Sequence, residues 1–174
     1  MSICSQVYHL SFNETSITGL HQWSGGAWKV VNGFEAPAST KKIGKVYVFS
    51  DGRWPFYVGK ATQPIRNRIR GAFKATPENR IAGFAGYRFK RDRTDAVIHV
   101  FTAQGAAHWS GQDAECIEAE VVYRVRTEGA WPEYQTEIHF SKPNEMHSAA
   151  ADSIFSVFKN LKDSGGLKLP ASDN

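Results

Sequence analysis

Hydrophobic and polar positions along the chain follow two periods, one typical of strands and one typical of helices. Short runs of β-branched and aromatic residues at Lys45–Phe49 and Phe56–Gly59 favour strands, as does the apolar run Asp95–Phe101. Between the first two runs lies Ser50–Pro55, in which Asp-Gly and a proline mark a turn. The pattern therefore predicts a β-hairpin over residues 45–59 and a further strand after it.

Three other segments repeat their apolar residues at helical spacing, and each predicts an amphipathic helix. The first follows the hairpin, the second spans residues 114–125, and the third spans residues 144–161. Their packed faces are expected to contain Ile65, Ile69, Ala72 and Phe73 in the first, Ala114, Ile117, Val121 and Val125 in the second, and Ile154, Phe155, Phe158 and Leu161 in the third. Short strands combined with such helices predict a small α/β domain.

One carboxylate falls within the apolar stripe of the second helix. At roughly 100° per residue, Glu118 lies inside the stripe, whereas Glu115 and Glu120 point away from its centre. An unpaired buried charge is costly, so such a group is usually salt-bridged or bound to a metal. Glu118 is therefore a candidate metal ligand, with an internal ion pair to Arg124 or Arg68 as the structural alternative.

The hairpin carries two motifs that resemble those of the GIY-YIG nuclease family. They are Lys45-Val46-Tyr47 and Tyr57-Val58-Gly59, with Lys45 where the family has its first glycine. The resemblance continues into the next helix, where Ile65-Arg66-Asn67-Arg68-Ile69 matches the pattern aliphatic-x-x-Arg-aliphatic. Helical periodicity alone does not choose between Arg66 and Arg68, and the resemblance selects Arg68.

Two later strings complete the resemblance, which covers roughly residues 44–140. The family's glutamate lies in a string of the form Ala-x-x-x-Glu-x-x-aliphatic-aliphatic, and this string places Glu118. The stretch Pro132–Gln135 corresponds to a Pro-x-aromatic-Asn string, with Gln135 instead of asparagine. Four elements in the same order make the match more specific than any one of them.

The resemblance implies a fold, a reaction and a set of roles. The fold is α/β, with a small three-stranded, mostly antiparallel sheet flanked by helices. The reaction is metal-dependent hydrolysis of DNA phosphodiester bonds by an endonuclease. Glu118 would hold one divalent cation, Mg²⁺ or Mn²⁺, and Tyr47 would be the general base on the attacking water. Tyr57 would hydrogen-bond the phosphate or the water, and Arg68 would neutralise phosphoryl charge. A phenolate needs nearby positive charge, which Lys60 or Arg68 could supply.

Further candidates lie around this group. Gln135, Glu137 and His139 follow an element already assigned near the site and form a second tier, with His139 or a metal-bound hydroxide as alternative bases. Basic residues that interleave with aromatic ones are expected to contact nucleic acid, or else to form a solvated surface. They are Arg66, Arg70, Lys74, Arg88, Lys90, Arg91 and Arg93.

Composition changes this interpretation little. The chain has 174 residues and a formal net charge of +4, a mild bias toward polyanions. Cys4 and Cys116 are far apart and lack zinc-ligand spacing, so zinc is not expected. No signal peptide or membrane-spanning run is visible, so a cytoplasmic protein without membrane contact is expected.

Three segments are expected: an N-terminal extension over residues 1–43, a nuclease core over 44–140, and a C-terminal segment over 141–174 with a helix and, from Asp163 onward, a mobile tail. The N-terminal extension is expected to pack on the core as an extra strand, with a role in gripping the substrate as the alternative. A chain of this size favours a stand-alone restriction or genome-defence nuclease. The alternatives are an inactive nucleic-acid-binding module and the nuclease subunit of a repair or mobile-element assembly. DNA is the expected partner, with RNA as an alternative, and a homodimer is compatible with the sequence.

Overall fold

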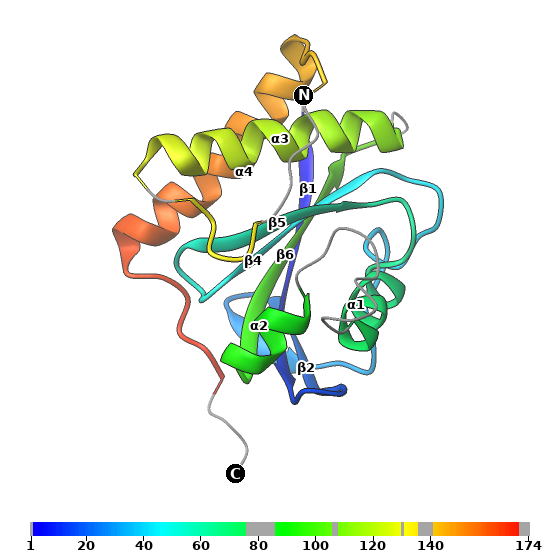
Figure 1. Cartoon of the computed structure of the whole chain (residues 1–174), viewed down its shortest axis with the longest axis vertical. Helices are drawn as coiled ribbons and strands as arrows, with labels where there is room; N and C mark the ends of the chain where they lie inside the picture. Colours follow the sequence, from blue (N-terminus) through cyan, green and yellow to red (C-terminus); the bar gives the residue numbers. More distant parts are fainter. Residues whose placement is uncertain (1, 76–85, 106–107, 130, 136–140, 171–174) are drawn as a thin grey trace.

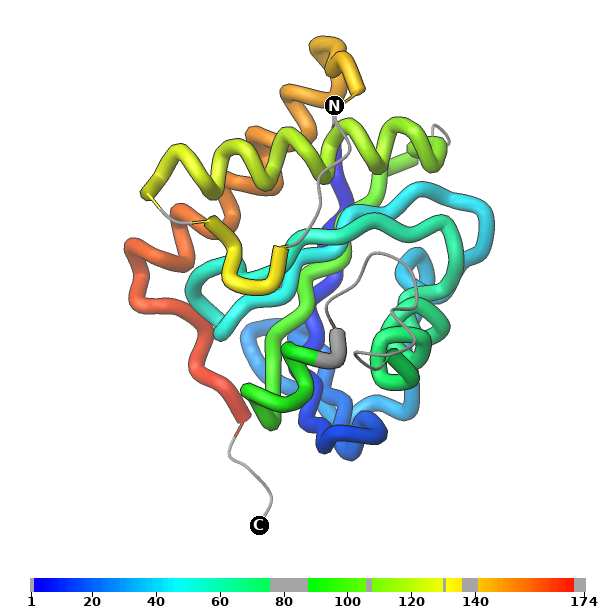
Figure 2. The backbone as a smooth tube through the Cα atoms, viewed as in Figure 1, coloured from blue at the N-terminus to red at the C-terminus, as the bar shows by residue number. Residues whose placement is uncertain are grey.

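The computed structural model describes residues 2–75, 86–105, 108–129, 131–135 and 141–170 (Figures 1 and 2). Its strands are β1 (Ile3–Phe12), β2 (Ile17–Ser24), β3 (Ala27–Val30), β4 (Lys45–Ser50), β5 (Pro55–Ala61) and β6 (Asp95–Ala103). Its helices are α1 (Ile65–Lys74), α2 (Gly86–Asp92), α3 (Gly111–Thr127) and α4 (Glu145–Ser164). The predicted hairpin, the later strand and all three predicted helices are confirmed. The basic segment after α1, which was expected to be a contact loop, contains the short helix α2.

The strands form one antiparallel sheet in the order β3-β2-β1-β6-β4-β5. The predicted three-stranded sheet is therefore wrong in its number of strands, because β1, β2 and β3 continue it beyond β6. β1 pairs with β6 along its length, from Ile3 opposite Ala103 to Ser11 opposite Asp95. The N-terminal extension is thus part of the sheet, and its first strand runs through the middle of the molecule (Figure 2).

A turn signal for the added strands was present in the sequence. Gly25 and Gly26 join β2 to β3 and have φ angles of 61° and 83°. This left-handed backbone is easy for glycine and suits a tight hairpin turn between Trp23 and Trp28, which lie opposite each other. A Gly-Gly pair between two aromatic runs is therefore the feature that could have predicted this hairpin.

Side chains alternate between the two faces of the sheet and form two hydrophobic cores. One core contains Tyr47, Phe49 and Tyr57 together with the buried faces of α1 and α2. The other contains Val46, Val48 and Val58, which pack under α3 and α4. The sheet is therefore a middle layer covered on both faces, with β5 as one of its edges (Figure 1).

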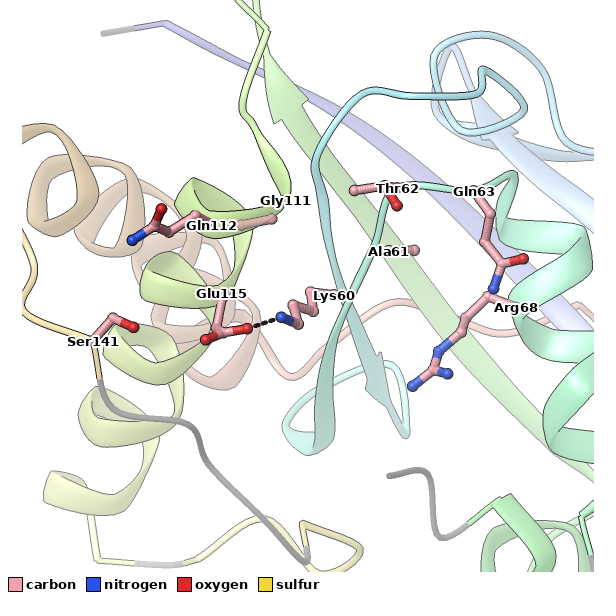
Figure 3. Close-up of a pocket in the computed structure, with 10 residues that line it drawn as sticks. Lys60, Ala61, Thr62, Gln63, Arg68, Gly111, Gln112, Glu115 and Ser141 are labelled. Carbon is pink, nitrogen blue, oxygen red and sulfur yellow. Dashed lines mark hydrogen bonds and ion pairs between the residues drawn. The ribbon is translucent and has the colours of Figure 1, made fainter. Parts of the chain in front are cut away.

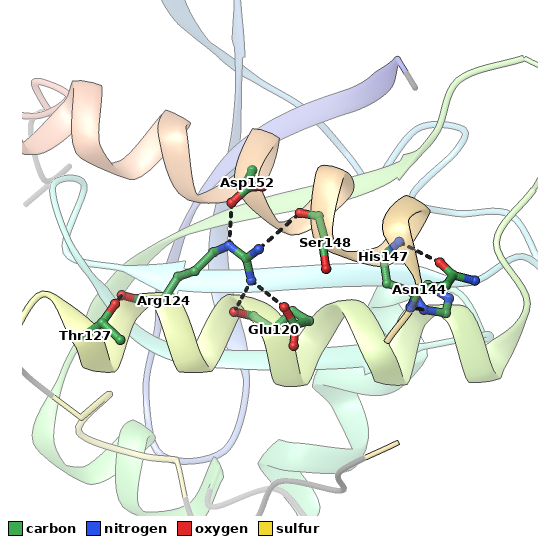
Figure 4. Close-up of polar contacts among 7 residues, drawn as sticks. All are labelled: Glu120, Arg124, Thr127, Asn144, His147, Ser148 and Asp152. Carbon is green, nitrogen blue, oxygen red and sulfur yellow. Dashed lines mark hydrogen bonds and ion pairs between the residues drawn. The ribbon is translucent and has the colours of Figure 1, made fainter. Parts of the chain in front are cut away.

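A polar network joins α3 to α4 on the outer side of the second core (Figure 4). Arg124 Nη1 lies 2.7 Å from Glu120 Oε2 within α3, and Arg124 Nε lies 2.6 Å from Asp152 Oδ1 on α4. Arg124 Nη2 also donates to the carbonyl oxygen of Ser148 at 3.3 Å. Arg124 is thus an inter-helix clamp that pairs with Glu120 rather than with Glu118.

Two segments without regular structure cover exposed parts of the sheet. The main chain of Tyr134 donates to the carbonyl of Phe56 at 3.0 Å, along the outer edge of β5. After α4, Leu167 N donates to Gly52 O at 2.9 Å, and Trp28 Nε1 donates to Lys168 O at 2.7 Å. The segment expected to be a mobile tail thus begins as part of α4 and then hydrogen-bonds the β4–β5 turn. None of the described helices is long and apolar enough to cross a membrane.

Candidate active site

Four of the candidate side chains come together at the β5 edge of the sheet. Tyr47 comes from β4, Tyr57 from β5, Arg68 from α1 and Glu118 from α3. Because β5 is an edge strand and α3 packs across it, side chains from opposite faces can meet beyond this edge. The charge on Glu118 acts on both tyrosines, and the charge on Arg68 acts on both tyrosines and on Glu118. The four groups therefore form one electrostatic unit.

Gly59 makes room for the two tyrosines. It lies opposite Tyr47 in the β4–β5 register. A Cβ atom at position 59 would lie 2.5 Å from Cζ and Oη of Tyr47 and 2.8 Å from Cε1 of Tyr57. The ring of Tyr47 thus passes directly over the glycine, and its hydroxyl reaches above β5. Any side chain at this position would displace the tyrosines.

Tyr47 is almost fully buried and is held by Arg68. Arg68 Nε donates a hydrogen bond to Tyr47 Oη at 3.0 Å, and Tyr47 is also hydrogen-bonded to Tyr57. Burial raises the pKa of Tyr47 above its ordinary value, and the Arg68 guanidinium only partly opposes this rise. Burial likewise raises the pKa of Tyr57 well above its ordinary value. Both tyrosines are therefore neutral phenols at pH 7, and the expected lowering of the Tyr47 pKa by Arg68 is outweighed by burial.

Lys60 does not take the expected place beside Tyr47. Adjacent residues of a strand point to opposite faces, so Lys60, which follows Gly59, points to the α3 side. There Lys60 Nζ forms an ion pair with Glu115 Oε2. Its charge lowers the pKa of Glu118, whereas the positive charge that acts on Tyr47 comes from Arg68. Lys60 is thus a neighbour of the carboxylate and not a partner of Tyr47.

Glu118 differs from Glu115 and Glu120, the other two glutamates of α3. Glu115 pairs with Lys60 and Glu120 pairs with Arg124, whereas Glu118 forms no hydrogen bond or ion pair with any of the residues that the structure describes. Burial raises the pKa of Glu118 to about 7, against the opposing charges of Lys60 and Arg68. The helical periodicity had singled out this same residue as the carboxylate aimed inward.

A partly buried carboxylate with no close partner among the described residues fits a hard divalent cation. Mg²⁺ is usually held by one or two carboxylates and keeps several waters, so it does not need a cage of protein ligands. Among the described residues no group of three or more His, Cys, Asp or Glu side chains is arranged around a common centre. Within the described part of the site, Glu118 thus remains a candidate metal ligand.

A pocket of about 720 Å³ opens beside these groups, between α3 and α1 (Figure 3). Arg68 lines it from α1, Lys60 from β5 and Glu115 from α3, where the Lys60–Glu115 ion pair spans part of its width. Polar residues that the sequence did not single out complete the lining: Thr62, Gln63, Gln112 and Ser141. Arg68 therefore faces both the buried Tyr47 and an open polar cavity.

Lys45 has a structural role that the sequence did not suggest. Its side chain is 0 % exposed, and Nζ donates to the carbonyl oxygens of Thr40, Ile43 and Gln63 at 2.7, 3.1 and 3.3 Å. Burial lowers the pKa of Lys45 to about 8. The lysine ties the loop before β4 to the segment that leads into α1, and so it supports the position of Arg68.

The seven basic residues expected to contact nucleic acid divide into two groups. Five are exposed: Arg66, Arg70, Lys74, Arg88 and Arg91. Lys90 Nζ donates to the carbonyls of Phe73 and Ala75 at the end of α1. Arg93 pairs with Glu133 at 3.0 Å and lies 4.3 Å from the centre of the Phe56 ring. Lys90 and Arg93 are therefore engaged in internal contacts, as is Arg88, whose guanidinium lies 5.8 Å from the centre of the Tyr134 ring. Contact of the seven residues with nucleic acid stays a prediction.

Only one of the three second-tier residues, Gln135, lies in the described part of the chain. Gln135 is 7 % exposed, and its Oε1 accepts a hydrogen bond from Val58 N at 3.1 Å. It thus satisfies a main-chain donor of β5, next to Tyr57. Glu137 and His139 lie outside the described residues.

Comparisons of the whole chain with models of protein families, with curated proteins and with solved structures found no match.

Proposed function

We propose that the protein is a metal-dependent endonuclease of the GIY-YIG type that hydrolyses DNA phosphodiester bonds, acting alone as a restriction or genome-defence enzyme. The observation that carries the proposal is the unit at the β5 edge. Arg68 lines a polar pocket and also joins a hydrogen-bonded Tyr47, a second buried tyrosine and Glu118, which has no hydrogen bond or ion pair among the described residues. Perturbed pKa values at a cleft are typical of catalytic groups.

Each group meets a need of phosphodiester hydrolysis. The reaction needs an activated water, stabilisation of charge on the phosphoryl oxygens and help for the leaving oxygen. The Arg68 guanidinium, which lines the pocket, stabilises the phosphoryl charge. Tyr57 donates a hydrogen bond to the phosphate or to the water. Tyr47 positions the water. Once enough positive charge stands beside it to offset burial, Tyr47 loses its own proton to solvent, and the phenolate then accepts the proton of the attacking water.

Glu118 and Arg68 set the charge around the reacting phosphate and water. A divalent cation on the Glu118 carboxylate, Mg²⁺ or Mn²⁺, would supply positive charge to the phosphoryl group, the leaving oxygen and the tyrosine hydroxyls when bound. Glu118 must be ionised for this role, and its pKa of about 7 makes that state dependent on pH. Lys60 favours the ionised form.

The pH dependence of cleavage tests the role of Tyr47. Glu118 must lose its proton near pH 7, and Tyr47 at a higher pH, so the wild-type rate should keep rising over about pH 6 to 9. Tyr47→Phe should reduce turnover by about 10²-fold or more, and its remaining rate should level off above about pH 7. Tyr57→Phe should be less severe. A Tyr47→Phe protein with the wild-type rate and profile would place the base elsewhere.

Gly59→Ala should disable the site without changing any charge. The new methyl group cannot share its space with the Tyr47 hydroxyl, so both tyrosines must shift, and a shift of about 1 Å in a catalytic group can cost about 10²-fold in rate. Gly71→Ala in α1 is the matched control, because nothing lies within 4 Å of its Cβ position. The control should cleave normally and gain about 0.5–1 kcal/mol of stability. Cleavage rates of the two variants are compared after circular dichroism has shown that both fold. Equal rates would show that a methyl group at position 59 does not displace the tyrosines from a catalytic position.

The proposal itself is tested with supercoiled plasmid, incubated with and without Mg²⁺, followed by mapping of the ends. Nicked or linear product that depends on the metal and disappears in Glu118→Gln is the expected result. Binding of DNA without any cleavage in either condition would instead identify a nucleic-acid-binding module.

A further inference from the structure

The three basic residues on the outside of α1 lie on the other side of the helix from Arg68. Arg66, Arg70 and Lys74 follow one another at every fourth residue, so they form a single stripe along α1. Arg68 lies roughly 200° around the helix axis from Arg66. The buried residues of α1 lie between them on the sheet side, so the stripe and Arg68 flank the helix.

Each flank borders its own hollow. Arg68 lines the pocket of about 720 Å³ at the candidate active site. On the other flank, two adjoining pockets of about 230 and 280 Å³ share Ile17 and Arg66, and Arg70 and Lys74 line the second. The opposite wall of these two pockets is the start of β2 and the turn before it, which include Thr15 and Ser16. α1 is therefore a ridge between two hollows, each lined by basic side chains of this helix.

Hydrogen bonds fix the segments that form the walls of the second hollow. Asn13 Oδ1 accepts hydrogen bonds from the main chains of Thr15 and Ser16, both at 2.9 Å, which fixes the β1–β2 turn. Lys90 holds the carbonyl end of α1, as described above. Within the described residues neither Arg66 nor Arg70 forms an ion pair, and both side chains are exposed. The charges of Arg66 and Arg70 are therefore exposed to solvent where the two side chains line the second hollow.

The dimensions of α1 suit one form of nucleic acid. An α-helix with side chains is about 10–12 Å across, and the major groove of B-DNA is about 12 Å wide. The walls of that groove are the phosphate backbones of the two strands. The crest of α1, opposite its buried face, carries Asn67, whose short side chain allows close approach to base pairs.

We infer that the protein binds double-stranded DNA with α1 in the major groove, so that the cut strand passes Arg68 and the opposite strand lies between Arg66, Arg70, Lys74 and the β1–β2 turn. This inference rests on the proposed function, which supplies the cut strand. It gives the N-terminal hairpin a task, as the outer wall of the groove for the uncut strand. Single-stranded substrates favour exposed aromatic stacking platforms. The exposed large apolar side chains of the described residues, Val30, Tyr123, Trp131 and Leu169, line neither hollow.

The test compares a short fluorescent duplex with its labelled single strand, with binding measured by anisotropy in EDTA across a salt series. The double variant Arg66→Gln, Arg70→Gln should lose about tenfold or more in duplex affinity and less than about twofold in single-strand affinity. The slope of log affinity against log salt for the duplex should fall by about 2, one unit per lost phosphate contact. The control is Arg126→Gln, Lys159→Gln, which removes the same charge from α3 and α4 and should behave as wild type.

Groove choice is tested separately. Bulky groups at pyrimidine C5, which project into the major groove, should weaken wild-type binding, and a minor-groove ligand should not. Equal losses of the arginine variant on duplex and single strand, an unchanged salt slope, or competition by the minor-groove ligand alone would overturn the inference. The proposed function fails differently: wild type would then bind duplex as expected but cut no DNA with Mg²⁺. If wild type cleaves DNA but the arginine variant binds duplex as well as the control does, the proposed function stands and the inference about α1 is rejected.

Discussion

Glu118→Gln should abolish DNA cleavage and at the same time make the protein more stable above neutral pH. Loss of the carboxylate removes the charge that holds the cation, which is worth several kcal/mol in the transition state, so turnover should fall by about 10³-fold or more. The stability effect follows from the raised pKa of Glu118. The folded state holds the proton more tightly than the unfolded chain, so wild-type stability falls as pH rises from about 4.5 through about 7.

Glutamine at position 118 is neutral at every pH, so the variant does not lose stability as the pH rises. The variant should therefore exceed wild type by up to about 3 kcal/mol at pH 8 in metal-free buffer, and the two should converge near pH 5. Urea unfolding at both pH values measures the difference. Mg²⁺ should raise the melting temperature of wild type and not of the variant. Glu120→Gln is the control: it should still cleave and should lose a little stability with its Arg124 pair. An inactive Glu120→Gln beside an active Glu118→Gln would show that the wrong glutamate had been assigned.

Arg68→Ala is expected to lower turnover at saturating DNA by about 10²- to 10³-fold, the usual effect of removing one donor that stabilises transition-state charge. The same change takes away the cation that opposes the rise in the Tyr47 pKa, so the pH profile of the remaining activity should move to higher pH. Arg68→Lys should recover little, because an ammonium cannot reproduce the planar donor set of the guanidinium.

Arg70→Ala is the matched control for this variant, since it lies on the same helix but lines the other hollow. Its main effect should be weaker binding with a flatter salt dependence, and a much smaller loss of turnover at saturation. Single-turnover rates at saturating DNA separate the two effects. Similar losses of turnover for Arg68→Ala and Arg70→Ala would remove the special status of Arg68.

Local patterns predicted the parts of the fold that local physics decides. The hairpin over β4 and β5, the strand β6 and the buried faces of α1 and α3 follow from residue type and spacing, and all are confirmed. The number of strands does not follow, because pairing of β1 with β6 joins residues about ninety positions apart. No local period encodes a partner at that distance. A β-like run at the N-terminus is compatible with a packed arm as well as with a central strand.

The candidate site divides in the same way. The helical period identified Glu118 as the inward carboxylate, since direction around a helix is a local property. The environment of Tyr47 is not local: its pKa depends on burial and on which cation approaches it, and that cation is Arg68 rather than Lys60. Strand alternation could have assigned Lys60 to the α3 side, because Gly59 lies opposite Tyr47. Arg68 lies at one hollow and Arg66 and Arg70 at the other. This placement likewise depends on residues far away in the sequence that line each hollow.

The central place of β1 has a consequence for how the chain reaches its native state. β1 leaves the ribosome about ninety residues before β6, so the middle of the sheet cannot form until β6 has been made. A fragment that starts at residue 44 would expose the whole β6 edge as an open template for pairing with other chains. The part that resembles a nuclease core is thus not a separable folding module, and refolding of the full chain should be slow and sensitive to protein concentration.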